Sequence, residues 1–192
     1  MKSLCVFCGS SPGANAAYVN AARSFGELLA TNNITLIFGG GKVGLMGQLA
    51  DAVLNNGGKA IGVIPSRLAI KEVAHAGLTD LHVVKNMHTR KALMYELSDA
   101  FVALPGGTGT LDELFEVFTW TQLGFLTKPL GLLNVNNYFD HLTSFLSHTV
   151  EERFVKPEHL DMLLVDSNQE SLLSRLNKYI PSQSSKWIDT TA

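Results

Sequence analysis

The feature that most constrains the fold of this chain is a repeated alternation of short apolar runs, small-residue turns and amphipathic segments. Most of the apolar runs are continuous rather than alternating, which is typical of parallel strands covered on both faces. About seven such runs predict strands at residues 4–9, 34–39, 60–64, 81–84, 100–105, 129–135 and 162–166. Helical patterns lie between them at residues 15–31, 44–56, 87–98, 110–123, 138–152 and 169–178. The alternation predicts an α/β fold with a doubly wound parallel β-sheet of about seven strands flanked by helices.

The length and composition suit one domain. The chain has 192 residues, of which 46% are hydrophobic and 17% charged, and no break in composition marks a second domain. A chain of this size can bury a sizeable core. We therefore expect a single domain over residues 1–180, followed by a short polar C-terminal tail over residues 181–192 that we expect to be flexible.

The charge balance argues against some classes of partner. The formal net charge is −2, so bulk electrostatics does not favour binding to nucleic acid or to a membrane surface. The N-terminal apolar run is too short for the hydrophobic region of a signal peptide, and no segment approaches the length of a transmembrane helix. We therefore expect a cytoplasmic protein with no nucleic-acid partner and no membrane partner.

Two cysteines and six histidines are the candidates for redox or metal chemistry. Cys5 and Cys8 have C-x-x-C spacing, but they fall in a predicted strand, where residues three apart point to opposite faces. A redox pair of this spacing sits at a helix N-terminus instead, so we expect two buried strand cysteines. The histidines have no zinc-binding spacing, and no cysteine joins them. We therefore expect no metal site.

The turns that follow the predicted strands indicate where a ligand binds. In a doubly wound sheet, ligands bind outside the carboxyl ends of the strands. Residues 9–11, 39–41 and 105–110 are small, hydroxylated or rich in glycine, whereas residues 65–67 are less so. The convergence of three such turns at one edge of the sheet predicts a binding site there.

The stretch GGGKVGLMG, which begins at Gly39, follows a predicted strand and opens a predicted helix. Gly39, Gly41 and Gly44 satisfy the G-x-G-x-x-G pattern, but the next strand ends in IPSR, without the acidic residue that a dinucleotide site needs. A Walker A loop is also excluded, because Lys42 is followed by Val43 rather than by Ser or Thr. Two interpretations remain: an anion site of backbone amides at a helix N-terminus, or a tight turn with close helix–sheet packing.

The stretch PGGTGT, which begins at Pro105, is a second glycine-rich turn. Its backbone N–H groups can point at one anion with the support of the helix dipole, and the hydroxyl groups of Thr108 and Thr110 add donors. The alternative is a glycine turn in which Thr110 is the N-cap of the helix, although two extra glycines exceed what a cap needs.

Three carboxylates, those of Asp112, Glu113 and Glu116, follow this turn directly. On a helix that starts near Thr110, Glu113 and Glu116 are three residues apart and share a face. Acids in a first helical turn also complement the helix dipole, which explains Asp112 and Glu113 without any ligand. A phosphorylated sugar would explain both the glycines and the acids, because its phosphate would lie on the amides and its ring would reach the carboxylates.

Two adjacent cations, Arg90 and Lys91, stand at the start of the helix predicted at residues 87–98. Cations at a helix N-terminus interact unfavourably with the dipole, so their placement needs a reason. An arginine fork beside a lysine is a natural complement of phosphate. The alternative is a solvated helix start, and we favour the phosphate site.

Together these stretches resemble a known family. PGGTGTLDE fits the pattern P-G-G-x-G-T-x-x-E, MHTRK precedes it, and GGGKVGLMG and EVAHAGLTDLHVV complete the resemblance. From about residue 4 to residue 166, the chain resembles the LONELY GUY family of cytokinin riboside 5′-monophosphate phosphoribohydrolases. Members of this family are often labelled lysine decarboxylases, but nothing here resembles the lysine site of a pyridoxal-phosphate enzyme.

The resemblance implies a Rossmann-like nucleotide-binding domain that acts as an N-glycosyl hydrolase. The expected substrates are adenosine 5′-monophosphates, in particular N6-modified ones, which would yield the free cytokinin or adenine base and ribose 5-phosphate. The resemblance also implies a homodimer or a higher oligomer, of which we expect the homodimer, and no metal or organic cofactor. The helix predicted at residues 110–123 carries more apolar surface than one sheet contact needs, which indicates a subunit interface unless core packing absorbs it.

Matching the family motifs residue by residue places the essential pair on Arg90 and Glu113. Glu113 beside the ribose would stabilise the oxocarbenium-like transition state and orient or activate water. Arg90 would bind the phosphate or assist the departing base, and Glu116 would hold Glu113 or a ribose hydroxyl. The substrate-binding residues expected from the motifs and their surroundings are Glu72, Lys91, Gly106, Gly107, Thr108, Gly109, Thr110, Glu116, Thr119, Gly9, Ser10 and Gly41.

Two other functions remain open. A nucleotide-binding carrier or sensor without catalysis would need the glycine turns but not the pair of Arg90 and Glu113. A general AMP or nucleoside-monophosphate nucleosidase would share the chemistry and differ in the base that it accepts. The candidates for a base pocket, each of which could instead belong to the core, are Met87, Met94, Phe115 and Trp120.

Overall fold

The structure is a computed structural model of the chain, and it describes residues 1–69 and 74–181. The expected substrate-binding residue Glu72 lies outside the described residues. Residues 182–192, which make up all but the first residue of the predicted flexible tail, also lie outside them.

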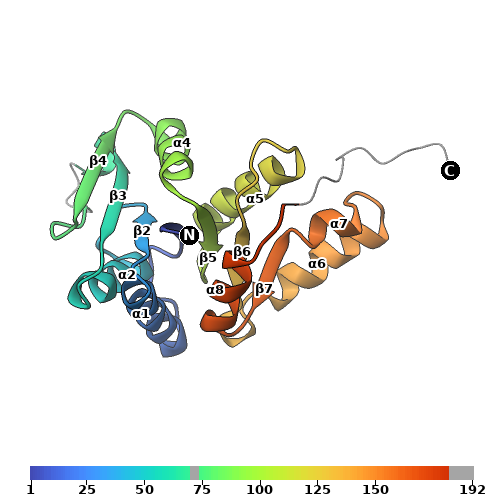
Figure 1. The fold of residues 1–192 in the computed structure, drawn as a ribbon, viewed down its shortest axis with the longest axis horizontal. Coiled ribbons are helices and arrows are strands. Elements are labelled where there is room, and N and C mark those ends of the chain that lie inside the picture. The colour runs from blue at the N-terminus through green and yellow to red at the C-terminus, as the bar shows by residue number, and fades with distance from the viewer. Residues whose placement is uncertain (70–73, 182–192) are drawn as a thin grey trace.

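One sheet of seven parallel strands organises the described part of the chain (Figure 1). The strands are β1 (Ser3–Phe7), β2 (Thr35–Phe38), β3 (Ala60–Pro65), β4 (Asp80–Val84), β5 (Ala100–Ala103), β6 (Leu130–Leu133) and β7 (Leu163–Asp166). Their order across the sheet is β4-β3-β2-β1-β5-β6-β7. The chain therefore winds outward from the central β1 through β4, and then from β5 through β7 in the other direction. The predicted α/β fold with a doubly wound parallel sheet is confirmed.

Helices cover both faces of the sheet. They are α1 (Ala16–Thr31), α2 (Gly44–Asn55), α3 (Ser66–Ala69), α4 (Met87–Leu97), α5 (Thr108–Gln122), α6 (Asp140–Glu151), α7 (Pro157–Leu160) and α8 (Gln169–Asn177), with a 3₁₀ turn, η1, at Val135–Asn137. Side chains of α1, α2 and α8 pack in one core cluster, and side chains of α4, α5 and α6 pack in the other. The sheet is thus the middle of three layers. None of the described helices combines the length and the apolar character needed to cross a membrane.

Alternate residues of β1 point into the two core clusters, as the pleat of a strand requires. Leu4, Val6 and Cys8 belong to the cluster with α1 and α2, whereas Cys5 and Phe7 belong to the cluster with α4 and α5. Cys5 and Cys8 are therefore buried, free and on opposite faces, as predicted, although β1 ends one residue before Cys8. Burial raises the pKa of both thiols, and the negative charge of Glu113 raises it further, so both stay protonated near neutral pH.

The predicted elements agree with the structure to within a few residues, and one difference matters for the site. α5 begins at Thr108, two residues before the predicted start, and its N-cap is Gly107. The alternative in which Thr110 is the N-cap is therefore wrong: Thr110 lies inside the first turn and is 4% exposed. The short helices α3 and α7 are not predicted, because four residues are too few to show a helical period.

The direction of winding reverses between β1 and β5, which are neighbours in the sheet. The helix after β1 packs on one face and the helix after β5 packs on the other. A reversal of this kind opens a crevice between the loops at the carboxyl ends of the two strands.

Candidate active site

A cavity of about 590 Å³ lies at the carboxyl ends of the central strands, next to this reversal. Its lining comes from the turn after β1 (Cys8, Gly9, Ser10), the turn after β2 and the start of α2 (Gly39, Gly41, Val43, Met46), β3 and α3 (Ile64, Leu68), α4 (Met87, Arg90) and the start of α5 (Gly107, Thr108, Gly109, Thr110, Asp112, Glu113). The three turns that the sequence singles out therefore meet at one site.

Backbone hydrogen bonds hold the glycine turns together. Gly9 N–H donates to the carbonyl oxygen of Pro105 at 3.0 Å, and Leu45 N–H donates to the carbonyl oxygen of Gly9 at 3.0 Å. Gly44 has a φ angle of +61°, and a Cβ atom there would collide with the backbone of Ser10. Glycine is therefore required at this position by conformation and by space.

Among the described residues, no side chain caps the N-terminus of α2 or of α5, two of the helices whose first turns line the cavity. By contrast, the side-chain oxygens of Asn15, Asn86 and Asn168 cap α1, α4 and α8. The N–H group of Leu111 donates to the carbonyl oxygen of Gly107, so the N–H groups between them precede the first hydrogen bond of α5. Such amides, at the positive end of a helix dipole, form a site for an anion such as phosphate.

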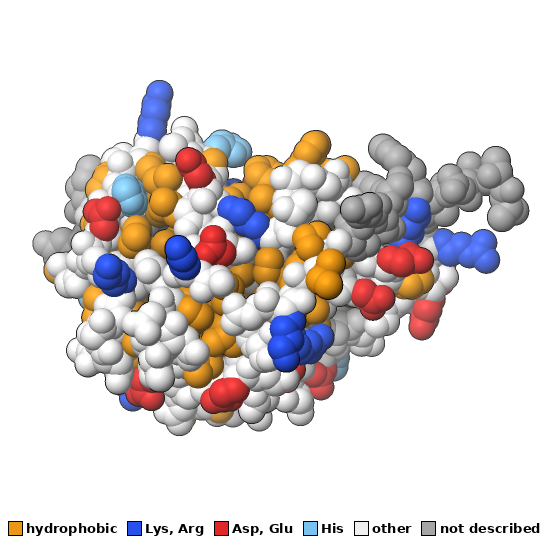
Figure 2. Space-filling view, viewed as in Figure 1, with side chains coloured by type: hydrophobic (Ala, Val, Ile, Leu, Met, Phe, Trp, Pro, Cys, Tyr) orange, Lys and Arg blue, Asp and Glu red, His pale blue; other side chains and the backbone are white. Residues whose placement is uncertain are grey.

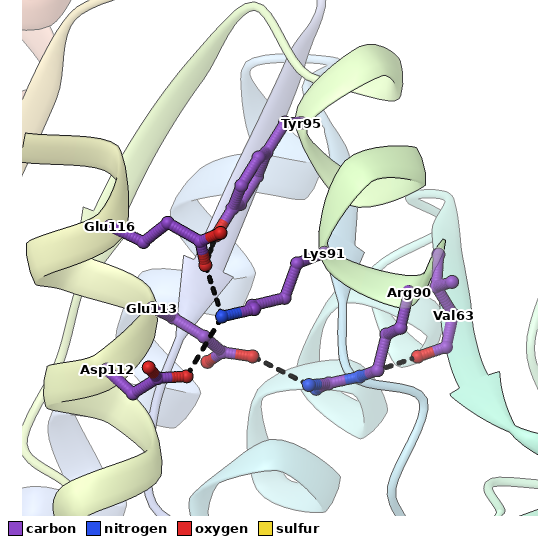
Figure 3. A network of polar contacts seen from close by, with 7 residues as sticks. All are labelled: Val63, Arg90, Lys91, Tyr95, Asp112, Glu113 and Glu116. Atoms are coloured by element: carbon purple, nitrogen blue, oxygen red, sulfur yellow. Dashed lines mark hydrogen bonds and ion pairs between the residues drawn. The ribbon is translucent and has the colours of Figure 1, made fainter. Parts of the chain in front are cut away.

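Arg90 and Glu113 form a buried ion pair in this cavity (Figure 3). Arg90 Nη1 lies 2.7 Å from Glu113 Oε1, and Arg90 Nε donates to the carbonyl oxygen of Val63 at 3.0 Å. The two side chains are 11% and 10% exposed. α4 and α5 therefore present a guanidinium and a carboxylate to the same cavity, and β3 anchors the guanidinium. We call Arg90 and Glu113 the inner pair.

Burial raises the pKa of Glu113 above that of an ordinary glutamate, although the charge of Arg90 and its hydrogen bond act in the opposite direction. The negative charge of Asp112 raises this pKa further. A carboxylate in such surroundings is poorly solvated by water. Positive charge that develops beside it is therefore strongly stabilised.

A second set of polar contacts joins the same two helices (Figure 3). Lys91 forms an ion pair with Glu116 and another, at 3.2 Å, with Asp112. Tyr95 OH donates to Glu116 Oε2 at 3.0 Å. We call these four residues the outer cluster. Glu116 contacts Lys91 and Tyr95 rather than Glu113. The predicted role of Glu116 in holding Glu113 is therefore wrong.

The outer cluster borders a second, more open depression. This depression is lined by Lys91, Thr108, Leu111, Asp112, Phe115, Glu116, Thr119 and Trp120. Thr108 and Asp112 also line the first cavity, so the first turn of α5 forms the wall between the two hollows.

The structure brings most of the expected site residues to the first cavity: Gly9, Ser10, Gly41, Arg90, Gly107, Thr108, Gly109, Thr110 and Glu113. Lys91, Glu116 and Thr119 line the second depression instead. Gly106 supports the turn, because its carbonyl oxygen accepts a hydrogen bond from Tyr138 OH at 2.6 Å.

Sequence reasoning missed most of the apolar part of the cavity. Val43, Leu68 and Met87 are 38%, 43% and 44% exposed, and all three line it. Only Met87 is among the residues expected in a base pocket. An exposed apolar side chain at a cap or in a four-residue helix carries no periodic signal, so the pattern could not reveal Val43 or Leu68.

The other base-pocket candidates fall elsewhere. Met94 is 1% exposed and belongs to the core beneath α4. Phe115 and Trp120 border the second depression. Of the four candidates, Met87 thus lies where a ligand in the first cavity could touch it.

Charged side chains of both signs are interspersed on the face shown in Figure 2, and apolar side chains gather near its centre.

Within residues 1–69 and 74–181, no group of three or more histidine, cysteine, aspartate or glutamate side chains could hold a metal ion. The charged residues that line the first cavity in this part of the chain are Arg90, Asp112 and Glu113.

Fold and site together define a Rossmann-like α/β protein with two uncapped helix N-termini and a buried arginine–glutamate pair at the reversal of winding. The molybdenum cofactor binding protein of the phototrophic bacterium Rippkaea orientalis shares the fold, with a TM-score of 0.70 and 21% identity over 93% of this chain and 97% of that one. The molybdenum cofactor carrier protein of Chlamydomonas reinhardtii has a TM-score of 0.69 and 17% identity over 92% and 96%. At such identities the likeness shows the fold alone.

Sequence comparisons show the family. A family model described as "Possible lysine decarboxylase" matches residues 46–176. The chain is 48% identical over 176 residues to the cytokinin riboside 5′-monophosphate phosphoribohydrolase of Rhodococcoides fascians, covering 91% of this chain and 89% of that protein. It is 46% identical over 180 residues to an Arabidopsis thaliana protein of the same name, covering 94% and 84%. The chain belongs to this family, the LONELY GUY family that its motifs resemble.

Proposed function

We propose that this protein hydrolyses the N-glycosidic bond of N6-modified adenosine 5′-monophosphates and releases the free cytokinin base and ribose 5-phosphate. The observation that carries the proposal is the buried inner pair beside the uncapped start of α5. Relatives that are 48% and 46% identical are named for this activity, which supports the same reaction here.

The phosphate of the substrate would lie on the amides at the start of α5. The N–H groups of Thr108, Gly109 and Thr110 precede the first hydrogen bond of the helix, and the helix dipole favours a dianion there. A guanidinium has five N–H groups, so Arg90 keeps donors for the substrate beyond those that it gives to Glu113 and Val63. The family's essential arginine can therefore bind the nucleotide without leaving Glu113.

Glu113 would then assist the cleavage of the N-glycosidic bond. As the bond between C1′ and the base nitrogen lengthens, positive charge grows on the ribose, and the buried carboxylate stabilises it. Glu113 would also accept a proton from the attacking water, whose oxygen forms the new bond to C1′. The base leaves with the bonding electrons and takes up a proton.

The apolar wall of the cavity favours an N6-modified base over plain adenine. Val43, Leu68 and Met87 leave large apolar side chains exposed in the same cavity. An alkyl substituent on the base would cover this surface, and burying apolar area stabilises the complex. A general AMP nucleosidase would use the inner pair in the same way but would leave this surface uncovered.

A product assay tests the proposal. Purified protein would be incubated separately with AMP and with N6-isopentenyl-AMP, and the free base and ribose 5-phosphate would be measured by liquid chromatography. We expect both products, with kcat/KM at least about tenfold higher for the modified nucleotide. Equal values would favour the general nucleosidase. Binding of both nucleotides without cleavage would contradict hydrolysis and favour the carrier or sensor.

We also propose that the protein is a cytoplasmic homodimer. Phe125, Phe145 and Phe154 are 74%, 60% and 83% exposed, and large exposed aromatic side chains are typical of contact surfaces. Sedimentation equilibrium should give twice the mass of the chain. A mass equal to that of one chain at micromolar concentration would contradict the dimer.

A further inference from the structure

Gly39 follows β2 directly and lies against the guanidinium of Arg90. A Cβ atom on Gly39 would fall well inside the contact distance of Arg90 Nη2 and would lie 3.3 Å from Arg90 Cζ. It would also lie 3.4 Å from the sulfur atom of Met46. An alanine therefore fits at this position only if the guanidinium moves.

Backbone conformation does not explain this glycine. Gly40 and Gly44, in the same turn, have φ angles of +71° and +61°, which strain any residue with a side chain. Gly39 is not among the described residues with a positive φ angle, so alanine could adopt its backbone conformation. The remaining reason for a glycine at position 39 is that Arg90 occupies the space that a side chain would need.

Arg90 cannot make room without losing contacts. Its Nε atom donates to the carbonyl oxygen of Val63 at 3.0 Å, and its Nη1 atom donates to Glu113 at 2.7 Å. The guanidinium is planar and rigid, so its nitrogen atoms move together. A shift that relieves a collision at Nη2 therefore lengthens at least one of these two hydrogen bonds.

We propose that Gly39 is a positioning residue, which seats Arg90 between Glu113 and Val63 by leaving space for the guanidinium. The consequence for turnover rests on the proposed function, but the placement of Arg90 does not. A misplacement of about 1 Å in an active site can cost about 100-fold in rate. Gly39→Ala should therefore lower kcat about 100-fold.

Gly77→Ala is the matched control. A Cβ atom on Gly77 would lie 3.4 Å from the nearest atom of His75, which is an ordinary contact, and Gly77 does not line the cavity. Circular dichroism and thermal unfolding would first establish that both variants are folded.

The first measurement is the solvent exchange of the Arg90 Nε–H proton by NMR, with the signal assigned from its loss in Arg90→Lys. We expect exchange about tenfold faster in Gly39→Ala, because the hydrogen bond to Val63 is weakened, and unchanged exchange in Gly77→Ala. The proposal would be overturned if Gly39→Ala left unchanged the exchange of both this proton and the Nη–H protons of Arg90, which report the hydrogen bonds to Val63 and to Glu113. This measurement requires no activity, so it decides the placement of Arg90 even if the wild type cleaves no nucleotide and the proposed function fails.

The second measurement is a double-mutant cycle with the product assay. Gly39→Ala should lower kcat about 100-fold in the wild type, but by less than about twofold in the Arg90→Ala background. Equal losses in the two backgrounds would overturn the proposal, because the loss of kcat in Gly39→Ala would then not depend on Arg90.

Discussion

The inner pair and the outer cluster join the same two helices, and they differ in what surrounds them. The inner pair is about nine-tenths buried and faces the glycine turns, whereas the carboxylates of the outer cluster are more exposed, Glu116 at 23% and Asp112 at 62%, although Lys91 is only 12% exposed. Arg90 and Lys91 are sequence neighbours, yet each joins a different set. Consecutive residues of a helix point about 100° apart, so adjacency in sequence does not give a common role.

This difference in surroundings predicts that the inner pair and the outer cluster contribute to activity in different ways. The charges of the inner pair are little screened by water, so removing one partner leaves an uncompensated charge in the cavity. In the outer cluster, Glu116 is anchored by the buried Tyr95 and bridged to Lys91, which holds α4 and α5 together. The inner pair should therefore decide catalysis, and the outer cluster should mainly support its geometry.

The largest expected effect separates the two cations. Arg90→Ala should lower kcat/KM about 100- to 1,000-fold, because both the substrate and Glu113 lose a buried charge partner. Lys91→Ala should cost less than about tenfold, because Lys91 lies outside the first cavity. Steady-state kinetics on N6-isopentenyl-AMP checks both variants. An equal or larger loss in Lys91→Ala would abolish the distinction between inner and outer sets.

The pH dependence of kcat/KM tests the inner pair by a second route, because it reports the pKa values of the free enzyme. In the proposed mechanism the carboxylate of Glu113 is the active form, so kcat/KM should fall about tenfold for each pH unit below the pKa of Glu113. Burial raises this pKa, so the fall should begin above the ordinary value of 4.5. Glu116→Gln should keep the same inflection. An inflection below 4.5, or one that moves in Glu116→Gln, would assign the acidic limb to another group.

A smaller effect is expected from substitutions that test whether the base binds in the first cavity or in the second depression. Met87→Ser should lower the ratio of kcat/KM for N6-isopentenyl-AMP to that for AMP about tenfold, because Met87 belongs to the apolar wall of the first cavity. Phe115→Ser, which alters the second depression, should leave this ratio unchanged within about twofold. The reverse outcome would place the substituent of the base in the second depression.

The smallest expected effect concerns Asp112. Asp112→Asn should change kcat less than about twofold and the free energy of unfolding by no more than about 1 kcal/mol, because Lys91 keeps its ion pair with Glu116. The difference in stability should shrink further at high salt, since exposed charges are screened. Urea unfolding at two salt concentrations measures it. A large loss that salt does not reduce would contradict the supporting role of the outer cluster.

Much of the inner site could be predicted from the sequence, because topology alone brings its parts together. Continuous apolar runs gave the parallel sheet, and the carboxyl ends of parallel strands meet at one edge. Glycine turns at that edge, and the motifs that contain Arg90 and Glu113, then indicated one cavity. The family assignment, which rests on the same motifs, is confirmed by the comparisons.

The other parts of the site could not be predicted, because they depend on features that leave no pattern in the sequence. α5 starts at Thr108 because a glycine N-cap suffices there, whereas the strongest cap signal pointed to Thr110. The turning of Lys91 away from the first cavity depends on the rotation of α4 relative to α5. Leu68 lies in a four-residue helix that has no period to detect.

The most direct test of the central claim compares Glu113→Gln with Glu116→Gln, two like substitutions three residues apart on α5. The release of ribose 5-phosphate from N6-isopentenyl-AMP would be measured for both, with nucleotide binding followed by calorimetry. We predict that Glu113→Gln lowers kcat at least about 100-fold while still binding the nucleotide, and that Glu116→Gln loses less than about tenfold. Substantial turnover by Glu113→Gln, or a greater loss in Glu116→Gln, would contradict the assignment of the inner pair as the catalytic centre.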